Sequence, residues 1–163
     1  MNILVTGGAG YIGSATSYLL LKKKINPIII DKLIYKNNNI IPKKSIFFKL
    51  NISNINLVKK IIKKYKIDSV IHFAAYKDVE ESVLKPKKYY VNNYLNSKKF
   101  IKCCKDNGIK NFIFSSTAAV YGNLNENKKV IEKTPLKPIS MYGKTKKKIE
   151  EYLSNISDKN FKF

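Results

Sequence analysis

Short runs that are apolar almost throughout alternate along this chain with longer stretches in which apolar residues recur at helical spacing. Strands that are covered on both faces read as such unbroken apolar runs. The runs that we interpret as strands cover about residues 2–6, 27–31, 46–50, 69–75 and 112–115. The stretches that we interpret as helices cover about residues 11–24, a segment that begins near Ser53 or Asn54, 86–106 and 141–155. Strands that alternate with helices predict an α/β fold, here a doubly wound parallel sheet with strand order 3-2-1-4-5.

Local signals support these boundaries. Ser53 or Asn54 can cap the second helix, Pro86 suits the first turn of the third, and Gly108 suits its end. Polar residues and proline predict surface loops over 32–44 and 122–139. Ligands of such sheets bind over the carboxyl ends of the strands, so we expect the functional residues there.

The first predicted strand leads directly into a glycine-rich turn that contains Gly7, Gly10 and Gly13. Glycines let the backbone approach a pyrophosphate closely, and the N-terminus of the following helix offers free N–H groups to the phosphates. Asp31 ends the second strand, where a carboxylate accepts the ribose hydroxyls and repels a 2′-phosphate. Strand, turn, helix and Asp31 together predict an NAD site. The alternative is a glycine turn in an unrelated α/β protein.

A second group of reactive side chains lies near the end of the chain. Tyr142 and Lys146 are four residues apart and share one face of the predicted last helix. An ammonium group beside a phenol favours the phenolate, which makes the phenol a usable base near neutral pH. Residues 115–117, at the end of the fifth strand, all carry hydroxyl groups. One of these hydroxyls can hydrogen-bond the substrate oxygen from which the phenol would take a proton. The alternative is that the pair belongs to a solvated helix face.

Charge and cysteine content narrow the classes of function. The net charge is +21, but all 32 basic residues are lysines, scattered along the chain, and arginine, the usual reader of guanine, is absent. We therefore expect no specific nucleic-acid partner.

Other features bear on where the protein is found. Because the chain has no long apolar run and its first strand starts at residue 2, we expect no membrane span and no signal peptide. Cys103 and Cys104 are adjacent and lack metal-ligand spacing, so we expect core thiols, no bound metal and a cytoplasmic protein. His72, within an apolar strand, is expected to be a packed structural residue.

Five motifs in order resemble the extended short-chain dehydrogenase/reductase family, over essentially the whole chain. They are Thr6-Gly7-Gly8-Ala9-Gly10-Tyr11-Ile12-Gly13, Ile71-His72-Phe73-Ala74-Ala75, Tyr89-Tyr90-Val91-Asn92-Asn93, the stretch from Phe112 to Gly122, and Tyr142-x-x-x-Lys146. The resemblance implies a reversible oxidation at carbon 4 of a uridine-diphosphate sugar, with NAD as the hydride acceptor.

The resemblance also implies roles for single residues. Tyr142 would take the proton of the sugar hydroxyl, Lys146 would tune Tyr142 and hold the nicotinamide ribose, and Thr117 would bind the sugar oxygen. The cofactor-binding residues that it implies are Gly7, Gly10, Tyr11, Ile12, Gly13, Asp31, Lys32, Asn51, Ile52, Phe73, Ala74, Ala75, Lys77, Asn92, Ser115, Tyr142 and Lys146. A homodimer is compatible with it.

Three comparisons with family members refine these expectations, and two of them are departures from the family pattern. Family members that act as 4,6-dehydratases carry Asp-Glu after the threonine, whereas this chain has Ala118 and Ala119, which cannot move protons; this favours epimerisation over dehydration. Asn51 stands where the family usually has aspartate, which predicts weaker adenine binding. Family members are also considerably longer, so we expect residues 1–163 to form the NAD-binding domain without the substrate domain. A non-catalytic remnant that still binds NAD is the alternative to an active epimerase.

Overall fold

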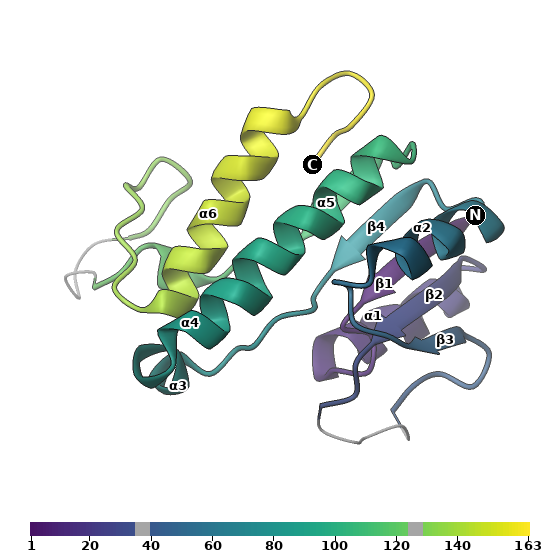
Figure 1. Cartoon of the computed structure of the whole chain (residues 1–163), viewed down its shortest axis with the longest axis horizontal. Helices are drawn as coiled ribbons and strands as arrows, with labels where there is room; N and C mark the ends of the chain where they lie inside the picture. Colours follow the sequence, from purple (N-terminus) through teal and green to yellow (C-terminus); the bar gives the residue numbers. More distant parts are fainter. Residues whose placement is uncertain (35–39, 124–128) are drawn as a thin grey trace.

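A computed structural model describes residues 1–34, 40–123 and 129–163. Its centre is a five-stranded sheet in the order β3-β2-β1-β4-β5 (Figure 1), and every neighbouring pair is parallel. The predicted fold class and strand order are therefore confirmed. The strands are β1 (Asn2–Thr6), β2 (Asn26–Asp31), β3 (Ile46–Lys49), β4 (Ser69–His72) and β5 (Asn111–Phe114).

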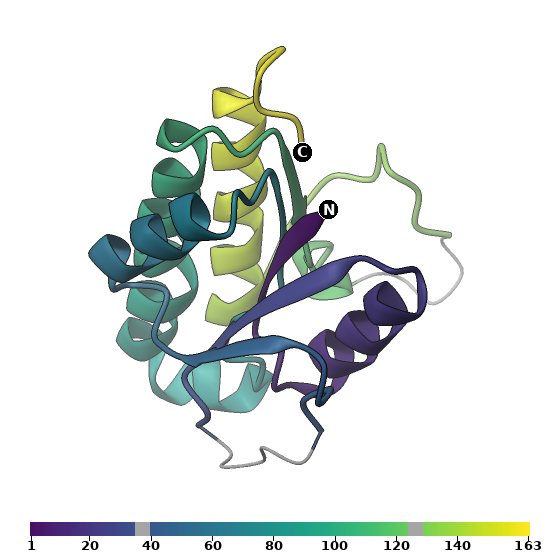
Figure 2. The ribbon, with the colours of Figure 1, turned by 90° about the vertical axis from the view of Figure 1, so that its right-hand side faces the viewer.

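Helices cover the two faces of the sheet unequally, as Figure 2 shows: α2, α5 and α6 lie on one side and α1 lies on the other. The larger core is formed by Leu4, Ile28 and Val70 of the sheet with apolar residues of α2, α5 and α6. The smaller core lies under Leu20 of α1. The helices are α1 (Tyr11–Lys22), α2 (Ile55–Lys64), α3 (Val79–Leu84), α4 (Pro86–Tyr89), the π-helix η1 (Tyr90–Asn96), α5 (Ser97–Asp106), the 3₁₀ turn η2 (Ala118–Val120) and α6 (Met141–Ile156).

Most of the predicted helix boundaries are confirmed. The side chain of Asn54 accepts from the backbone N–H of Leu57 and caps α2. Pro86 occupies the first turn of α4, and Gly108, with a φ of 82°, follows the end of α5. Lys24 adopts a positive φ of 58°, so α1 ends at Lys22, two residues earlier than predicted.

Three local features differ from the prediction. β4 ends at His72 instead of continuing to residue 75. After one more backbone bond, from Phe73 N–H to Thr6 O, the chain leaves the sheet close beside Gly7 of the glycine turn. The helix α3 was not predicted. The predicted helix 86–106 exists, but a π-helical segment lies in its middle. Parts of the two predicted loops, 35–39 and 124–128, lie outside the described residues.

The last residues of the chain pack beside β5. The N–H of Lys162 donates to the carbonyl of Lys110 and its carbonyl accepts from Phe112, so the segment pairs in parallel with the start of β5. The ring of Phe161 is 1% exposed and lies 5.9 Å from the ring of Phe112, between centroids. This segment therefore closes the end of the larger core.

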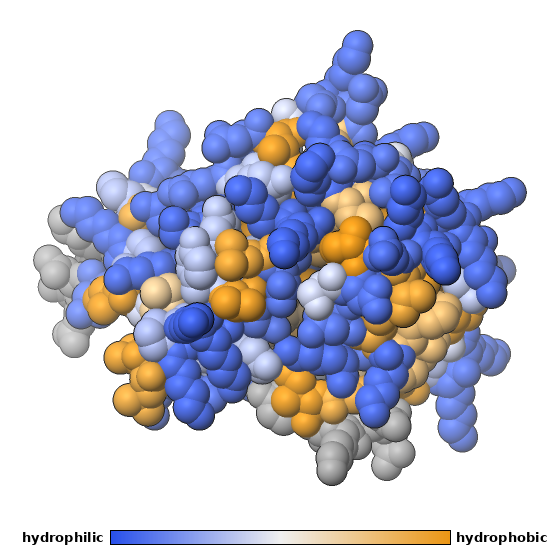
Figure 3. Space-filling view, viewed as in Figure 1, coloured by the Kyte–Doolittle hydropathy of each residue, from blue (hydrophilic) through white to orange (hydrophobic). Residues whose placement is uncertain are grey.

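The surface is mainly hydrophilic. On the face seen in Figure 3, hydrophilic side chains are spread between small apolar groups, as the scatter of lysines along the sequence predicts. Within the described ranges, no helix is both long enough and apolar enough to cross a membrane.

Candidate functional site

A row of backbone hydrogen bonds continues the sheet just past the ends of its strands. Ser115 N–H donates to His72 O at 3.2 Å, Phe73 N–H to Thr6 O at 3.0 Å, and Gly7 N–H to Ile30 O at 2.9 Å. These bonds align the ends of β5, β4, β1 and β2 along one edge, over a span of about 14 Å at the usual strand spacing. The predicted site residues that follow these strands therefore share the edge at which doubly wound sheets bind ligands.

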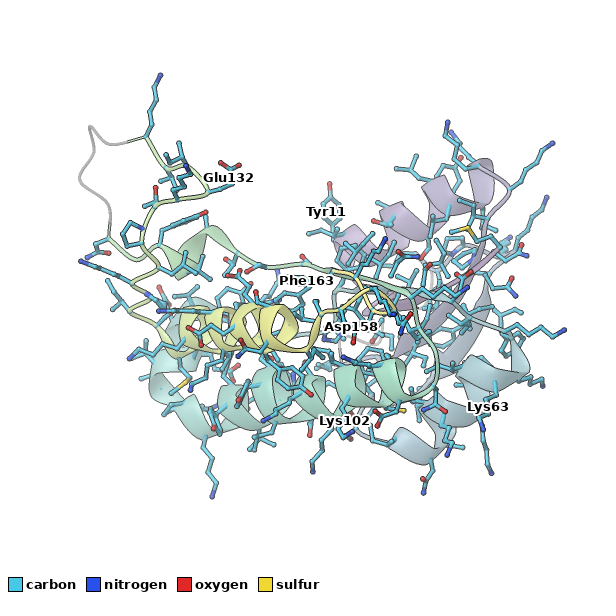
Figure 4. All side chains as sticks on the ribbon, turned by 90° about the horizontal axis from the view of Figure 1, so that it is seen from above. Tyr11, Lys63, Lys102, Glu132, Asp158 and Phe163 are labelled. Atoms are coloured by element: carbon cyan, nitrogen blue, oxygen red, sulfur yellow. The ribbon has the colours of Figure 1, made fainter. Side chains whose placement is uncertain are left out.

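The glycine turn is packed so closely that, at Gly7 and Gly13, a side chain would clash with backbone atoms. A Cβ on Gly7, whose φ is 73°, would lie 2.7 Å from the backbone N of Ala74, and one on Gly13 would lie 2.3 Å from Gly7 O. Gly10 is the N-cap of α1 and offers no side-chain acceptor to the N–H groups of the first turn. Tyr11 is 90% exposed and points away from the sheet (Figure 4). The turn thus presents bare backbone and a helix N-terminus to solvent, which suits a pyrophosphate.

The carboxylate of Asp31 is attached to this turn. It accepts from the backbone N–H of Ala9 at 3.1 Å and from that of Leu33 at 2.7 Å, one bond on each oxygen. Each carboxylate oxygen has a second acceptor position. Asp31 can therefore still accept hydroxyls of a ribose placed beside the glycine turn, as predicted.

Lys32, Asn51 and Asn92, which come from three segments, line one pocket of about 460 Å³. The ammonium of Lys32 donates to Asn92 Oδ1 at 2.8 Å and to the hydroxyl of Tyr76 at 3.0 Å. It also lies 4.1 Å from the centre of the Tyr76 ring, a cation–π contact. Asn51 Oδ1 accepts from the N–H of Ser53. Lys32 directly follows Asp31, so the pocket lies beside the end of β2.

Beyond β4, the backbone of Tyr76 is hydrogen-bonded to a side chain and not to a neighbouring strand. Asn93, which is 3% exposed, accepts from the N–H of Tyr76 at 2.9 Å and donates to the carbonyl of Tyr76 at 2.8 Å. This pair of bonds fixes the backbone just beyond Phe73, Ala74 and Ala75. Sequence reasoning missed Asn93, and its place beside Asn92 in the quoted motif is the one signal that pointed to it.

Lys146 is the most deeply buried cation of the candidate site, with 4% of its surface exposed. Its ammonium donates to the carbonyl of Ser115 at 2.6 Å and lies 5.9 Å from the centre of the Tyr142 ring. Burial lowers the pKa of Lys146 to about 8, and the nearby carboxylate of Glu150 opposes that effect. The predicted pair on one helix face is present, and it faces the end of β5.

Side-chain hydrogen bonds fix the start of α6 and the segment that follows β5. Ser140 caps α6 through the N–H of Gly143, and the hydroxyl of Ser82 in α3 accepts from the N–H of Tyr142 at 3.1 Å. Thr117 Oγ1 accepts from the N–H of Ala119 and starts η2. Sequence reasoning missed Ser82 with the whole of α3, although Asp78 accepting from the N–H of Glu81 is a recognisable cap.

Two predicted cofactor-binding residues, Ile52 and Lys77, differ in exposure, and His72 was predicted only as a packing residue. The side chain of Ile52 is 7% exposed and packs in the larger core, which leaves its backbone to meet a ligand. Lys77 lies on the exposed segment after the Asn93 contact. His72 is 1% exposed and is surrounded by the rings of Phe100, Phe112 and Phe114, so it is the packed residue that was predicted.

A parallel doubly wound sheet with a glycine turn tied to an acidic residue at the end of the second strand defines a domain of the Rossmann class. The sequence profile of the NAD dependent epimerase/dehydratase family matches residues 3–163, and the chain belongs to that family.

Individual relatives agree with this assignment. The chain is 40% identical over 154 residues to the UDP-glucose 4-epimerase of Lactobacillus helveticus, a match that covers 94% of this chain and 46% of that protein. The structure of the UDP-glucose 4-epimerase of Thermus thermophilus complexed with NAD superimposes with a TM-score of 0.91 at 31% identity and covers 95% of this chain and 50% of that one. The enzyme of Brucella ovis, also in complex with NAD, gives 0.89 at 35%, over 94% and 47% of the two chains. The chain thus spans about half the length of these relatives.

Proposed function

We propose that residues 1–163 form the NAD-binding domain of an epimerase that interconverts UDP-glucose and UDP-galactose at carbon 4. The arrangement at the end of β5 carries this proposal: Tyr142 and Lys146 lie on one face of α6, and Lys146 is anchored to Ser115 at the sheet edge that also bears the glycine turn. The similarity to UDP-glucose 4-epimerases over nearly the whole chain supports it.

The residues of this chain fit an extended NAD. The glycine turn would hold the pyrophosphate, Asp31 the adenosine ribose, and the pocket of Lys32, Asn51 and Asn92 the adenine end. Lys146 would hold the nicotinamide ribose. A bound NAD supplies reversible acceptance of hydride from carbon 4 of the sugar.

The acid–base work would fall to α6 and the end of β5. Tyr142 would take the proton of the 4-hydroxyl and later return it, with the ammonium of Lys146 5.9 Å from the centre of its ring. Thr117 would hydrogen-bond the sugar oxygen. Ala118 and Ala119 carry no proton to exchange, which favours epimerisation over 4,6-dehydration. We place the protein in the cytoplasm, where the buried Cys103 and Cys104 stay reduced.

Two measurements on the purified chain test the proposal: calorimetric titration with NAD, and a coupled assay that converts UDP-galactose to UDP-glucose. Tyr142→Phe should abolish turnover while keeping NAD affinity, and Tyr18→Phe, which removes a hydroxyl from an exposed position of α1, should change neither. NAD binding without any turnover would favour the alternative, a cofactor-binding domain with no catalysis of its own. A chain that does not bind NAD would overturn the proposal.

A further inference from the structure

Two side chains of α6 form hydrogen bonds with the segment that follows β5. Lys146 donates to the carbonyl of Ser115, and the hydroxyl of Ser116 donates to the carboxylate of Glu150. Tyr142, Lys146 and Glu150 are spaced four residues apart, so all three lie on one face of the helix. The residue after this doubly held pair is Thr117.

The surroundings of Lys146 are otherwise poor in compensating charge. The Phe114 ring lies 4.7 Å from the ammonium, and the titratable groups that face it are Tyr142 on its own helix and His72 on β4, which burial keeps neutral by lowering its pKa to about 3. Burial also lowers the pKa of Lys146, whereas the carboxylate of Glu150 raises it. Glu150 therefore acts on Lys146 as well as on Ser116.

We propose that Glu150 is a positioning residue with two effects: it holds Ser116, and with it Thr117, against α6, and it places a carboxylate one helical turn from the ammonium of Lys146 on the face that bears Tyr142. This inference rests on the proposed function for the roles of Tyr142, Lys146 and Thr117. The contacts themselves lie within this chain and need no cofactor.

The two effects can be separated by substitution. Glu150→Gln keeps an oxygen that can accept from Ser116 but removes the charge. Ser116→Ala keeps the charge but removes the hydrogen bond. Glu151→Gln is the matched control, because Glu151 is the next residue and its carboxylate lies 3.8 Å from the ammonium of Lys147, on another side of the helix.

The first readout is the titration midpoint of Lys146, followed by NMR of its ε-carbon in the chain without cofactor. Glu150→Gln should move the midpoint to lower pH by about one pH unit, because a nearby opposite charge is lost. Glu151→Gln should leave it in place. An unchanged midpoint in Glu150→Gln, or an equal shift in both variants, would overturn the role of the charge.

The second readout is the backbone order parameter of Ser116 and Thr117 from ¹⁵N relaxation. Ser116→Ala should lower the order parameters at both residues while the Lys146 midpoint stays near that of the wild type. Unchanged order parameters would overturn the positioning of Thr117. Both readouts are measured without NAD. A chain that does not bind NAD would therefore overturn the proposed function, whereas the role of Glu150 is judged by these two readouts alone.

Discussion

The hydroxyl of Thr6 on β1 lies 2.5 Å from Nδ1 of His72 on β4, so side chains join these two central strands in addition to the backbone ladder. Nε2 of the same ring lies 3.0 Å from the hydroxyl of Ser97 on α5. Both ring nitrogens are thus satisfied by hydroxyl groups, within a cage of phenylalanine rings. This environment suits a neutral imidazole.

The neutral state of His72 should make the fold sensitive to acid. Burial, helped by the charge of Lys146, lowers the pKa of His72 to about 3, below its ordinary 6.5. The unfolded chain therefore binds the proton more readily, and stability should be complete above pH 6.5 and fall as the pH drops from there toward 3. Between pH 6.5 and 5 we expect a loss of about 2 kcal/mol. Urea unfolding at these pH values measures it.

A matched pair of variants isolates this contribution. His72→Gln should be less stable at pH 7.5 but should lose the part of the pH dependence that belongs to the imidazole. Ser97→Ala should keep it, because burial is the main cause of the shift. An unaltered pH dependence in His72→Gln would show that other groups cause the acid sensitivity.

Lys146 should extend the same dependence into alkali, where stability again rises with pH. Its pKa in the folded chain, about 8, lies below the ordinary 10.5, so the unfolded chain holds the proton longer as the pH rises. The free energy of unfolding should therefore increase by about 2–3 kcal/mol between pH 8 and 10. Denaturant titrations across this range should show the rise in the wild type and in the exposed control Lys144→Met, and no rise in Lys146→Met.

Two glycines of the turn should respond differently to alanine. At Gly13 a Cβ would clash with Gly7 O at 2.3 Å, and Gly13→Ala should cost about 1–3 kcal/mol of stability. At Gly10 the nearest atom is Gly7 O at 3.2 Å, so Gly10→Ala should change stability by less than about 1 kcal/mol. The added methyl group should instead weaken NAD binding about tenfold or more, because under the proposed function the pyrophosphate lies against this position.

Unfolding curves and NAD titrations of both glycine variants measure these effects. If Gly13→Ala proves as stable as Gly10→Ala, the packing of the turn is looser than the structure shows. If Gly10→Ala binds NAD like the wild type, the pyrophosphate does not lie against this position.

The segment beside β5 offers a simple test of its contribution to the core. Phe161 is 1% exposed and belongs to the larger core, whereas Phe163, two residues later, is 54% exposed. Phe161→Ala should cost about 3–5 kcal/mol of unfolding free energy. Phe163→Ala should stay within about 0.5 kcal/mol of the wild type. Equal effects in thermal and urea unfolding would contradict the observed packing.

The sheet was predictable because its strands are nearly uninterrupted apolar runs and because parallel strands joined by helices have one common handedness. The attachment of Asp31 to the glycine turn was also within reach, since the carboxyl ends of neighbouring strands must meet. The helix α3 was not, because six residues between two charged stretches give too short an apolar period to recognise.

The candidate site was predicted as far as spacing along one element can show it. Tyr142 and Lys146 follow from helical geometry alone. The contacts of Glu150 with Ser116 and of Ser82 with Tyr142 join residues 34 and 60 positions apart, and only the folded arrangement brings them together. The π-helical segment that carries Asn92 and Asn93 has no distinctive composition, and the sequence reads there as ordinary helix.

The side-chain amide of Asn93 bonds both the N–H and the carbonyl of Tyr76, as the backbone of a neighbouring strand would. A sheet shares the support of each strand among many bonds, whereas the backbone of Tyr76, beyond β4, is held at both its N–H and its carbonyl by one side chain. A change of Asn93 that removes only this amide should therefore leave the sheet and the core in place and loosen the backbone at Tyr76, which lines the pocket of Lys32, Asn51 and Asn92.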